Sequence, residues 1–356
     1  MFHRRKPKSF PSIPLSPKEE ELYSAVLKPK SLGSKLRRYY YRLCILLLCV
    51  LILAVGLNLF SVKMKQARRQ SQSAALIQKL GGQVAYDDQG VIPPGAFPGL
   101  RKLLGNDFFD NVIKAILPPT AADADLECLE ALPNLETLDL GGTGVNNAGL
   151  ARLEGLTRLN FLNLDRTKIT GAALEHLKDL SKLQELSLRD TRVTDAGLAY
   201  LEKLSKLQVL ALDQTLITDA GLTHLKRLKQ LHTLGLHGTQ ITNDCINYLA
   251  LLPFIQKLDI SNTLITDTGL RRLKEIPHIR SLTLGGFLIT DDALDFLKEL
   301  PYLESLTLIH TLNSDAGLAH LEKLANLQTL DLKDTKVTDA GIQELQKALP
   351  KLKITR

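Results

Sequence analysis

The chain has little of several residue types, and each shortage excludes a class of protein. Among 356 residues there are four cysteines, two methionines and no tryptophan, and aromatic residues make up only 5%. Four cysteines in this length are too few for a fold held together by disulfides. Glycine and proline, with 23 and 15 residues, are too few for a collagen-like or low-complexity chain. The hydrophobic content of 44% is ordinary and excludes disorder over the whole chain.

The net charge of +7 lies outside the part of the chain that is expected to form the main domain. Residues 1–42 carry 11 basic and three acidic side chains, and residues 63–117 carry eight and four. Residues 118–356 carry 26 basic and 31 acidic side chains. Because nucleic-acid binding needs basic residues on the folded surface, we expect no nucleic-acid partner.

Residues 43–62, LCILLLCVLILAVGLNLFSV, are a long apolar run without a charged side chain. As a helix, such a run extends about 30 Å, which matches the hydrocarbon thickness of a bilayer. Tyr39, Tyr40, Tyr41 and Arg42 precede it, and basic residues follow it, as is typical of the two membrane interfaces. We therefore predict a transmembrane helix over residues 43–62.

Two alternatives for this run are a buried core helix and a cleaved signal peptide. A core helix of this length normally has a polar face, which the run lacks. Ala54, Val55 and Gly56 have the small size of a cleavage site, but 42 residues precede the run, too many for the basic segment of a signal peptide. An uncleaved signal anchor fits better. Within 20 residues of the run, six basic residues before it against five after it favour a cytoplasmic N-terminus.

Residues 1–42 are predicted to be a disordered basic tail, because their proline, serine and lysine content cannot form a core. The tail is expected to be attracted to anionic lipid headgroups. Its segment FPSIPLSPK is alternatively a polyproline II ligand.

A 24-residue repeat fills the C-terminal two thirds of the chain. Nine units share the pattern LxxLxLxxTxITDAGLxxLxxL without an insertion, and Phe287 replaces the threonine in one of them. So strict a period is the signature of a solenoid. The recurring threonines are Thr143, Thr167, Thr191, Thr215, Thr239, Thr263, Thr311 and Thr335.

The unit can be derived from its spacing. Leu186 and Leu188 are two residues apart and should point to one face of a short strand. Thr194 and Asp195 are good helix N-caps, and the apolar stripe that follows predicts a helix of two to three turns. One strand and one helix cannot bury these leucines alone, so the units must stack. The expected fold is an α/β solenoid with a curved parallel sheet inside and helices outside.

This pattern resembles the leucine-rich-repeat family from about Ala121 to Leu352. The TDAGL phrasing is similar to ribonuclease-inhibitor-like arrays common in planctomycete bacteria, where a membrane anchor often precedes the array. Residues 76–90 and 100–112 resemble the capping segments of those proteins. We accordingly expect a juxtamembrane segment and N-terminal cap over residues 63–120 and the repeat domain over residues 121–356. The resemblance implies a bacterial inner-membrane location and the habit of binding proteins, without naming a ligand.

Motifs for catalysis are scarce. The string LDLGGTGV at 138–145 is similar to phosphate-binding turns, but it stands in the repeat register. The histidines are spread over different units and form no metal motif, and no nucleophile motif occurs. Cys128 and Cys245 lie about five units apart, too far for a disulfide, and are expected to be buried thiols. We expect neither enzymatic activity nor a cofactor or metal.

The outward-pointing strand residues are the expected binding face. By register they are mostly small or polar and should have no packing role. Charge reversal of Arg189 or Asp213 should therefore change the stability of the fold by no more than about 0.5 kcal/mol. Departures from the repeat, at Phe287, Asn313, Ile309 and His310, cluster in neighbouring units. The candidate partner-binding residues are Phe161, Asp165, Glu185, Arg189, Asp213, His237, Lys257, Asp259 and Ile309.

The sequence therefore predicts a single-pass membrane protein whose solenoid binds a macromolecular partner, a protein of unidentified kind, on the non-cytoplasmic side. Two other functions fit the same features. One is a structural or spacer role in the cell envelope, and the other is a ligand-sensing receptor that signals through the N-terminal tail.

Overall fold

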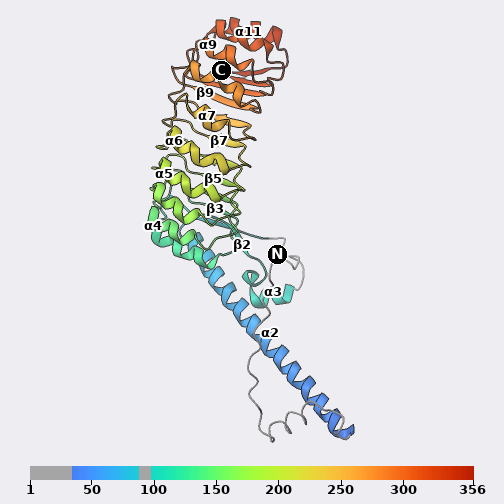
Figure 1. Ribbon diagram of the computed structural model, residues 1–356. Coiled ribbons are helices and arrows are strands. Elements are labelled where there is room, and N and C mark those ends of the chain that lie inside the picture. Colours follow the sequence, from blue (N-terminus) through green and yellow to red (C-terminus); the bar gives the residue numbers. More distant parts are fainter. Residues whose placement is uncertain (1–33, 88–97) are drawn as a thin grey trace, which may run out of the picture. The chain divides into compact units, whose positions relative to one another are not determined.

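The computed structural model describes residues 34–87 and 98–356, and the chain divides into two compact units between Lys65 and Gln66. Helix α2 (Ser34–Lys79) starts in the first unit and contains the whole predicted span (Figure 1). The side chains from Arg38 to Val62 are exposed. By length and composition, α2 is a helix that could cross a membrane. Most of the predicted N-terminal tail, residues 1–33, lies outside the described residues.

The second unit is built on one sheet of 12 strands in sequence order, which Figure 1 shows with helices along one face. All neighbouring pairs are parallel except β1 and β2, and from β2 onward each strand pairs with residues that lie 23 or 24 positions away. The strands are β1 (Gln83–Tyr86), β2 (Val112–Ile116), β3 (Thr137–Asp139), β4 (Phe161–Asn163), β5 (Glu185–Ser187), β6 (Val209–Ala211), β7 (Thr233–Gly235), β8 (Lys257–Asp259), β9 (Ser281–Gly285), β10 (Ser305–Ile309), β11 (Thr329–Asp331) and β12 (Lys353–Thr355).

The helical half of several units is shorter in its α part than predicted. In four of the nine units one turn of α-helix continues directly as a 3-10 helix, as from Asp195–Leu198 into Ala199–Lys203. Helix α11, with 10 residues, has the predicted length of two to three turns. The α-helices after α2 are α3 (Pro98–Leu104), α4 (Asn147–Leu150), α5 (Asp195–Leu198), α6 (Asp219–Leu222), α7 (Cys245–Leu249), α8 (Asp267–Leu270), α9 (Asp291–Leu297), α10 (Asp315–Leu318) and α11 (Asp339–Ala348). The 3-10 helices are η1 (Asn106–Phe108), η2 (Asp123–Ala131), η3 (Ala151–Leu153), η4 (Gly171–Leu177), η5 (Ala199–Lys203), η6 (Thr223–Arg227), η7 (Leu273–Glu275) and η8 (Ala319–Lys323).

The leucines of the pattern form one continuous core between the sheet and the helices. Leu186 and Leu188 from the strand and Leu198, Leu201 and Leu204 from the helical half are all at most 1% exposed. Each unit thus supplies one apolar layer that the next unit covers, which confirms the predicted α/β solenoid.

The turn after each strand explains the recurring threonine. Thr191 is buried, and its hydroxyl donates to the carbonyl of Leu188 at 2.6 Å. The residue before it has a left-handed backbone, with φ of 52° at Asp190. This conformation recurs in all nine units, where glycine, asparagine and aspartate tolerate it better than other residues. The left-handed residues are Gly142, Arg166, Asp190, Gln214, Gly238, Asn262, Gly286, His310 and Asp334.

The TDAGL segment links most units to the next, although one unit has Gly171 in place of the aspartate. Thr194 takes the N-cap position of α5, as predicted, but its side chain makes no cap hydrogen bond. Asp195 instead accepts from both the backbone N–H and the hydroxyl of Thr218 in the following unit, at 2.8 and 2.6 Å. A Cβ on Gly221 would lie 2.3 Å from Oδ1 of Asp195. The glycine is therefore needed because the aspartate of the preceding unit occupies that space.

The C-terminal part of α2 packs against the first end of the core. Ala74 and Ile77 are buried against the core. Gln70 donates to the carbonyl of Asp110 at 2.8 Å and accepts from the N–H of Val112. This part of α2, together with β1, covers apolar residues that the first repeat would otherwise expose. Residues 88–90 of the resembling cap segment lie outside the described residues.

Candidate functional site

The nine candidate residues lie at different heights of the open sheet face, defined here as the face opposite the helices. Phe161, Glu185 and Lys257 begin strands β4, β5 and β8, while Asp259 and Ile309 end β8 and β10. The other four follow strand ends by two residues. All nine are partly or fully exposed in the described structure. They are Phe161, Asp165, Glu185, Arg189, Asp213, His237, Lys257, Asp259 and Ile309.

Five of these residues line one hollow of about 420 Å³, which we call the open-face pocket. They are Arg189, Asp213, His237, Lys257 and Asp259. Phe161, Asp165, Glu185 and Ile309 do not line it. Its floor includes Ala211 and Gly235, the two smallest outward residues of adjacent strands β6 and β7. The hollow thus exists because two neighbouring units have alanine and glycine at a position where the units on either side have larger polar residues.

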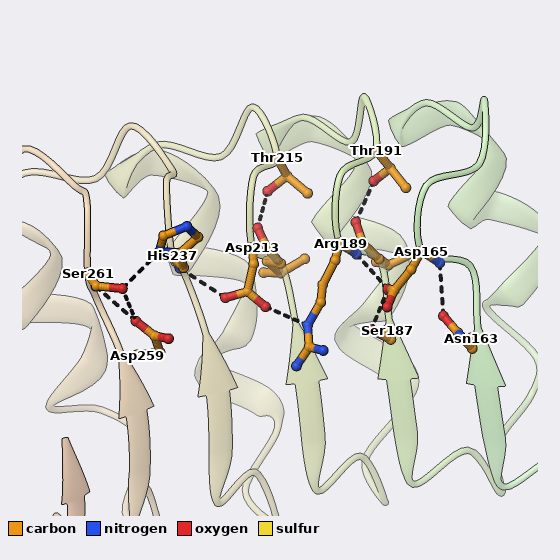
Figure 2. A network of polar contacts seen from close by, with 12 residues as sticks. Asn163, Asp165, Ser187, Arg189, Thr191, Asp213, Thr215, His237, Asp259 and Ser261 are labelled. Carbon is orange, nitrogen blue, oxygen red and sulfur yellow. Dashed lines mark hydrogen bonds and ion pairs between the residues drawn. The ribbon is translucent and has the colours of Figure 1, made fainter. Parts of the chain in front are cut away.

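A chain of hydrogen bonds joins these polar residues across the strands, as Figure 2 shows. Arg189 Nε donates to Asp213 at 2.8 Å, and the other oxygen of Asp213 accepts from the backbone N–H of His237 at 3.0 Å. The His237 ring is 2.8 Å from the Ser261 hydroxyl. That hydroxyl in turn lies 2.6 Å from Asp259. The pocket wall is therefore held by mutual contacts.

These bonds overturn the expectation that the outward residues have no structural role. Asp165 accepts from the backbone N–H of Arg189, one unit further, at 2.9 Å, and Asp213 does the same for His237. Where the strand itself ends in an acidic or amide residue, that residue accepts a hydrogen bond from a backbone N–H of its own unit instead, as Asp259 does from Ser261. Ser187 and Gly235 have no such side-chain acceptor, so the carboxylate comes from the preceding unit. Spacing alone did not reveal this alternation.

Gly235 is required by this arrangement. A Cβ at this position would lie 2.6 and 2.7 Å from the two carboxylate oxygens of Asp213. The Asp213 side chain therefore lies over strand β7 and is only 13% exposed, whereas its partner Arg189 is 58% exposed. The pair presents a guanidinium to solvent and keeps its carboxylate close to the backbone.

The charges of the pocket balance. Arg189 and Lys257 contribute two cations, and Asp213 and Asp259 contribute two carboxylates. Arg189 is paired, but Lys257 makes no side-chain hydrogen bond or ion pair with any residue that the structure describes. The exposed ammonium of Lys257 is thus the group best placed to meet an acidic or carbonyl group of a partner.

Serine, histidine and aspartate meet here, but not as a catalytic triad. In a triad the histidine lies between the nucleophile and the carboxylate. Here Ser261 lies between His237 and Asp259, and Ser261 is 2% exposed. The aspartate therefore does not orient the imidazole, and the hydroxyl cannot reach a substrate. The arrangement supports binding and positioning rather than acyl transfer.

The backbone amides of the DLGGT string are engaged by its own unit and by the next one. The N–H of Gly141 donates to Asp139 at 2.9 Å, and the N–H of Gly142 donates to the carbonyl of Asp165 at 2.7 Å. Both amides that would hold a phosphate are thus engaged. Over residues 34–87 and 98–356, no group of three or more His, Cys, Asp or Glu side chains is arranged to hold a metal ion.

Two further histidines and two cysteines of the repeats have structural surroundings. His176 and His224 lie within hydrogen-bond distance of Glu154 and Glu202 in the preceding units, at 2.6 and 2.8 Å. The contact with His224 lowers the pKa of Glu202. Burial raises the pKa of the Cys128 thiol to about 11 and also raises that of Cys245. Both cysteines are free and buried, as expected from their spacing.

Part of the pocket lining was not predicted from the sequence. Gln214, Thr233 and Ser281 also line it, and none was selected as a candidate. The signal that could have located the pocket is the succession of Ala211 and Gly235 in one outward column, where neighbouring units carry Ser187 and Asp259. Two consecutive small residues in such a column make a depression.

Comparisons with known proteins agree with this architecture. Residues 131–153, 179–201 and 323–345 match the family described as Leucine Rich repeat. The matched segments are leucine-rich repeats, and the parallel sheet with its leucine core is that of a leucine-rich-repeat solenoid.

Solved structures with some similarity include two internalins from Listeria monocytogenes. Internalin C2 is 29% identical over 63% of this chain and 85% of that chain, with a TM-score of 0.44. Another internalin is 20% identical over 72% of this chain and 93% of that chain, with a TM-score of 0.37. A search of curated proteins finds no match.

Proposed function

We propose that this chain is a membrane-anchored, non-catalytic module that binds a partner protein through the open-face pocket. Solenoids of stacked repeats generally use their extended sheet surface for binding. The observation that carries the proposal is the convergence of Arg189, Asp213, His237, Lys257 and Asp259 on one hollow of about 420 Å³.

The hydrogen bonds of the pocket favour binding for an energetic reason. Ordering a flexible side chain at an interface costs about 0.5–1.5 kcal/mol. Asp213 and Ser261 are already held by backbone and side-chain contacts before a partner arrives. A partner therefore meets a preorganised polar surface and loses less free energy in fixing it.

The anchor in this proposal is the apolar part of α2. Its most apolar 18-residue window has a mean hydropathy of 3.0, and none of that window is buried. We propose that residues 43–62 cross the inner membrane of a bacterium and hold the repeat domain on the non-cytoplasmic side. The slight excess of basic residues before the run supports this orientation.

Site-specific crosslinking in native membranes tests the binding face. Benzoylphenylalanine in place of Lys257 puts a photoreactive group into the open-face pocket, and the same group in place of Lys226 puts it on an exposed position of η6, on the helical side. After irradiation, we expect a discrete adduct with another protein from position 257 and none from position 226, identified by mass spectrometry.

The opposite pattern, with adducts from position 226 alone, would show that the helical side is the binding face. Adducts between two copies of this chain would favour the structural role instead. Arg189→Ala in the background of the position 257 probe should reduce the adduct yield, since it removes an exposed cation from the same pocket.

A further inference from the structure

Three consecutive units carry a proline followed by an aromatic ring in the turn that leads into the strand. The pairs are Pro253 with Phe254, Pro277 with His278, and Pro301 with Tyr302. At the ring position the neighbouring units have Lys206, Gln230 and Asn326. In a chain with 5% aromatic residues, three successive rings in one column are a concentrated feature.

The prolines change this turn. In four other units the residue at the proline position donates its backbone N–H to the carbonyl two residues earlier, as Ser181 and Ser205 do at 2.8 and 2.9 Å. Proline has no N–H to donate. The units from Pro253 to Tyr302 therefore forgo a turn hydrogen bond, and in each of them an exposed ring follows.

These rings line a second hollow of about 320 Å³, which we call the aromatic rim pocket. Its lining residues are Pro253, Phe254, Gln256, His278, Arg280 and Tyr302, and none of them lines the open-face pocket. Phe254 is 58% exposed and Tyr302 is 49% exposed. The His278 and Tyr302 rings are stacked, with centroids 6.3 Å apart, and the Arg280 guanidinium lies 5.9 Å from the Tyr302 centroid.

The polar groups of this pocket are mainly hydrogen-bond donors, and its charge is balanced. Arg280 forms an ion pair with Glu304 through Nη1. A guanidinium has five N–H groups, so others remain to donate, as do the Gln256 amide and the Tyr302 hydroxyl. A phosphate or polyanion would need a net positive charge, which the Arg280–Glu304 pair does not leave. The fitting ligand is neutral, apolar in part and rich in acceptors.

We propose that the aromatic rim pocket binds a proline-rich segment of a partner protein in the polyproline II conformation. Such a segment has no internal hydrogen bonds, and its prolines offer carbonyl acceptors without N–H donors. Aromatic-lined grooves are the known way of holding this conformation. The donors around Arg280 and the rings of Phe254 and Tyr302 complement both properties.

The spacing also matches. One turn of polyproline II advances about 9.3 Å, from three residues at about 3.1 Å each. Phe254 and Tyr302 are two units apart, which corresponds to two strand spacings, or about 9.6 Å. Every third residue of the ligand points to the same side. Two ligand residues one turn apart would therefore contact the rings of Phe254 and Tyr302. This surface is independent of the open-face pocket, so either proposal can fail without the other.

Titration of the full-length protein in detergent micelles with fluorescently labelled decaproline tests the proposal by fluorescence anisotropy. We expect saturable binding, which Phe254→Ala and Tyr302→Ala each weaken by about tenfold. Phe287→Ala is the matched control. Phe287 is an aromatic residue that is 74% exposed, and it lies in the turn at the opposite end of the strand. It should bind as the wild type does. Circular dichroism melts establish that each variant is folded.

Absence of saturable binding to the wild type would overturn the proposal, as would equal affinities of wild type, Phe254→Ala and Tyr302→Ala. Cellohexaose serves as a second probe. Binding of this sugar that depends on Tyr302, without binding of decaproline, would identify a glycan site and would also overturn the proposal.

Discussion

At the residue scale, Asp213 and Arg189 form an ion pair but differ in what their loss leaves behind. Asp213 accepts from the backbone N–H of His237 and is mostly covered, whereas Arg189 projects into solvent. Arg189→Ala should change the free energy of unfolding by no more than about 0.5 kcal/mol, because exposed ion pairs contribute little. Asp213→Ala should cost about 1–3 kcal/mol, because it leaves a backbone donor without its acceptor. Chemical denaturation of the purified protein measures both.

The reference variant for this comparison is Leu186→Ala. Leu186 lies in strand β5 and faces the core. Leu186 is 1% exposed, and its truncation should cost about 2–5 kcal/mol. Equal, small effects of Arg189→Ala and Asp213→Ala would mean that the hydrogen bond to His237 contributes nothing to stability.

Asn313 is a polar residue in a column of buried valine and isoleucine. It is fully buried, and its Nδ2 donates to the carbonyl of Thr290 at 2.7 Å. Its Oδ1 has no hydrogen-bond partner in the described structure, and neither has the hydroxyl of nearby Thr311. Asn313→Val should therefore raise the free energy of unfolding by about 1 kcal/mol, since it removes an unsatisfied buried acceptor.

Thermal melts of Asn313→Val and wild type check this expectation. Ile289→Asn, the reverse change in the preceding unit, provides the matched control and should be destabilising, because Ile289 is 2% exposed. A loss of stability in Asn313→Val would show that the bond to Thr290 outweighs the unsatisfied oxygen.

At the element scale, the contact between Asp195 and Gly221 determines how one unit stacks on the next. Gly→Ala in a helix normally stabilises by about 0.5–1 kcal/mol. Gly221→Ala should instead destabilise, because the new Cβ would lie 2.3 Å from the carboxylate that holds Thr218. Gly155→Ala is the control, since no atom lies within 4 Å of its Cβ position. It should be neutral or stabilising in the same denaturation experiment.

The same contact explains why asparagine replaces the aspartate in two units. Asn243 Oδ1 accepts from the N–H of Thr266 at 3.0 Å, and its amide donates to the Thr266 hydroxyl. The geometry is that of Asp195 and Thr218 with the hydroxyl bond reversed. An outcome in which Gly221→Ala and Gly155→Ala behaved alike would show that these links between units are easily displaced.

At the scale of the whole molecule, α2 has two parts. Residues 43–62 are apolar, and the C-terminal part of the helix packs on the folded domain. Deletion of residues 1–62 should leave a soluble protein with a cooperative melt, because Gln70, Ala74 and Ile77 remain. Deletion of residues 1–79 removes them and should cost roughly 2–5 kcal/mol from Ile77 alone. Differential scanning calorimetry compares the two truncated chains. Insolubility of the shorter deletion would place the domain boundary elsewhere.

Topology is tested by labelling with an impermeant maleimide. A cysteine at the exposed Ala85 should be labelled in intact spheroplasts, whereas one at Ser9, outside the described residues, should not. Background labelling should be low, because Cys44 and Cys49 lie within the proposed span, whereas Cys128 and Cys245 are buried and their thiol pKa values are raised. Labelling of Ser9→Cys alone would invert the proposed orientation.

The class of fold and the register follow from the repeat pattern alone. Leucines at fixed intervals can be buried only by stacking, so the period of 24 residues specified the parallel sheet, the continuous core and the outward column. The left-handed residue before each threonine was not predicted, although glycine, asparagine and aspartate are frequent there. That requirement is visible only in the backbone dihedral angles.

The contacts of the outward residues, in contrast, became visible only in the folded structure. Whether a carboxylate serves its own unit, as Asp259 does, or the next, as Asp213 does, depends on side-chain size one unit away. The two pockets likewise arise from residues 24 positions apart that become neighbours when the units stack. Core burial is set by a residue's own periodicity, whereas a polar contact between units depends on two positions together. For this physical reason the fold could be predicted from the sequence, and the polar contacts of its open sheet face could not.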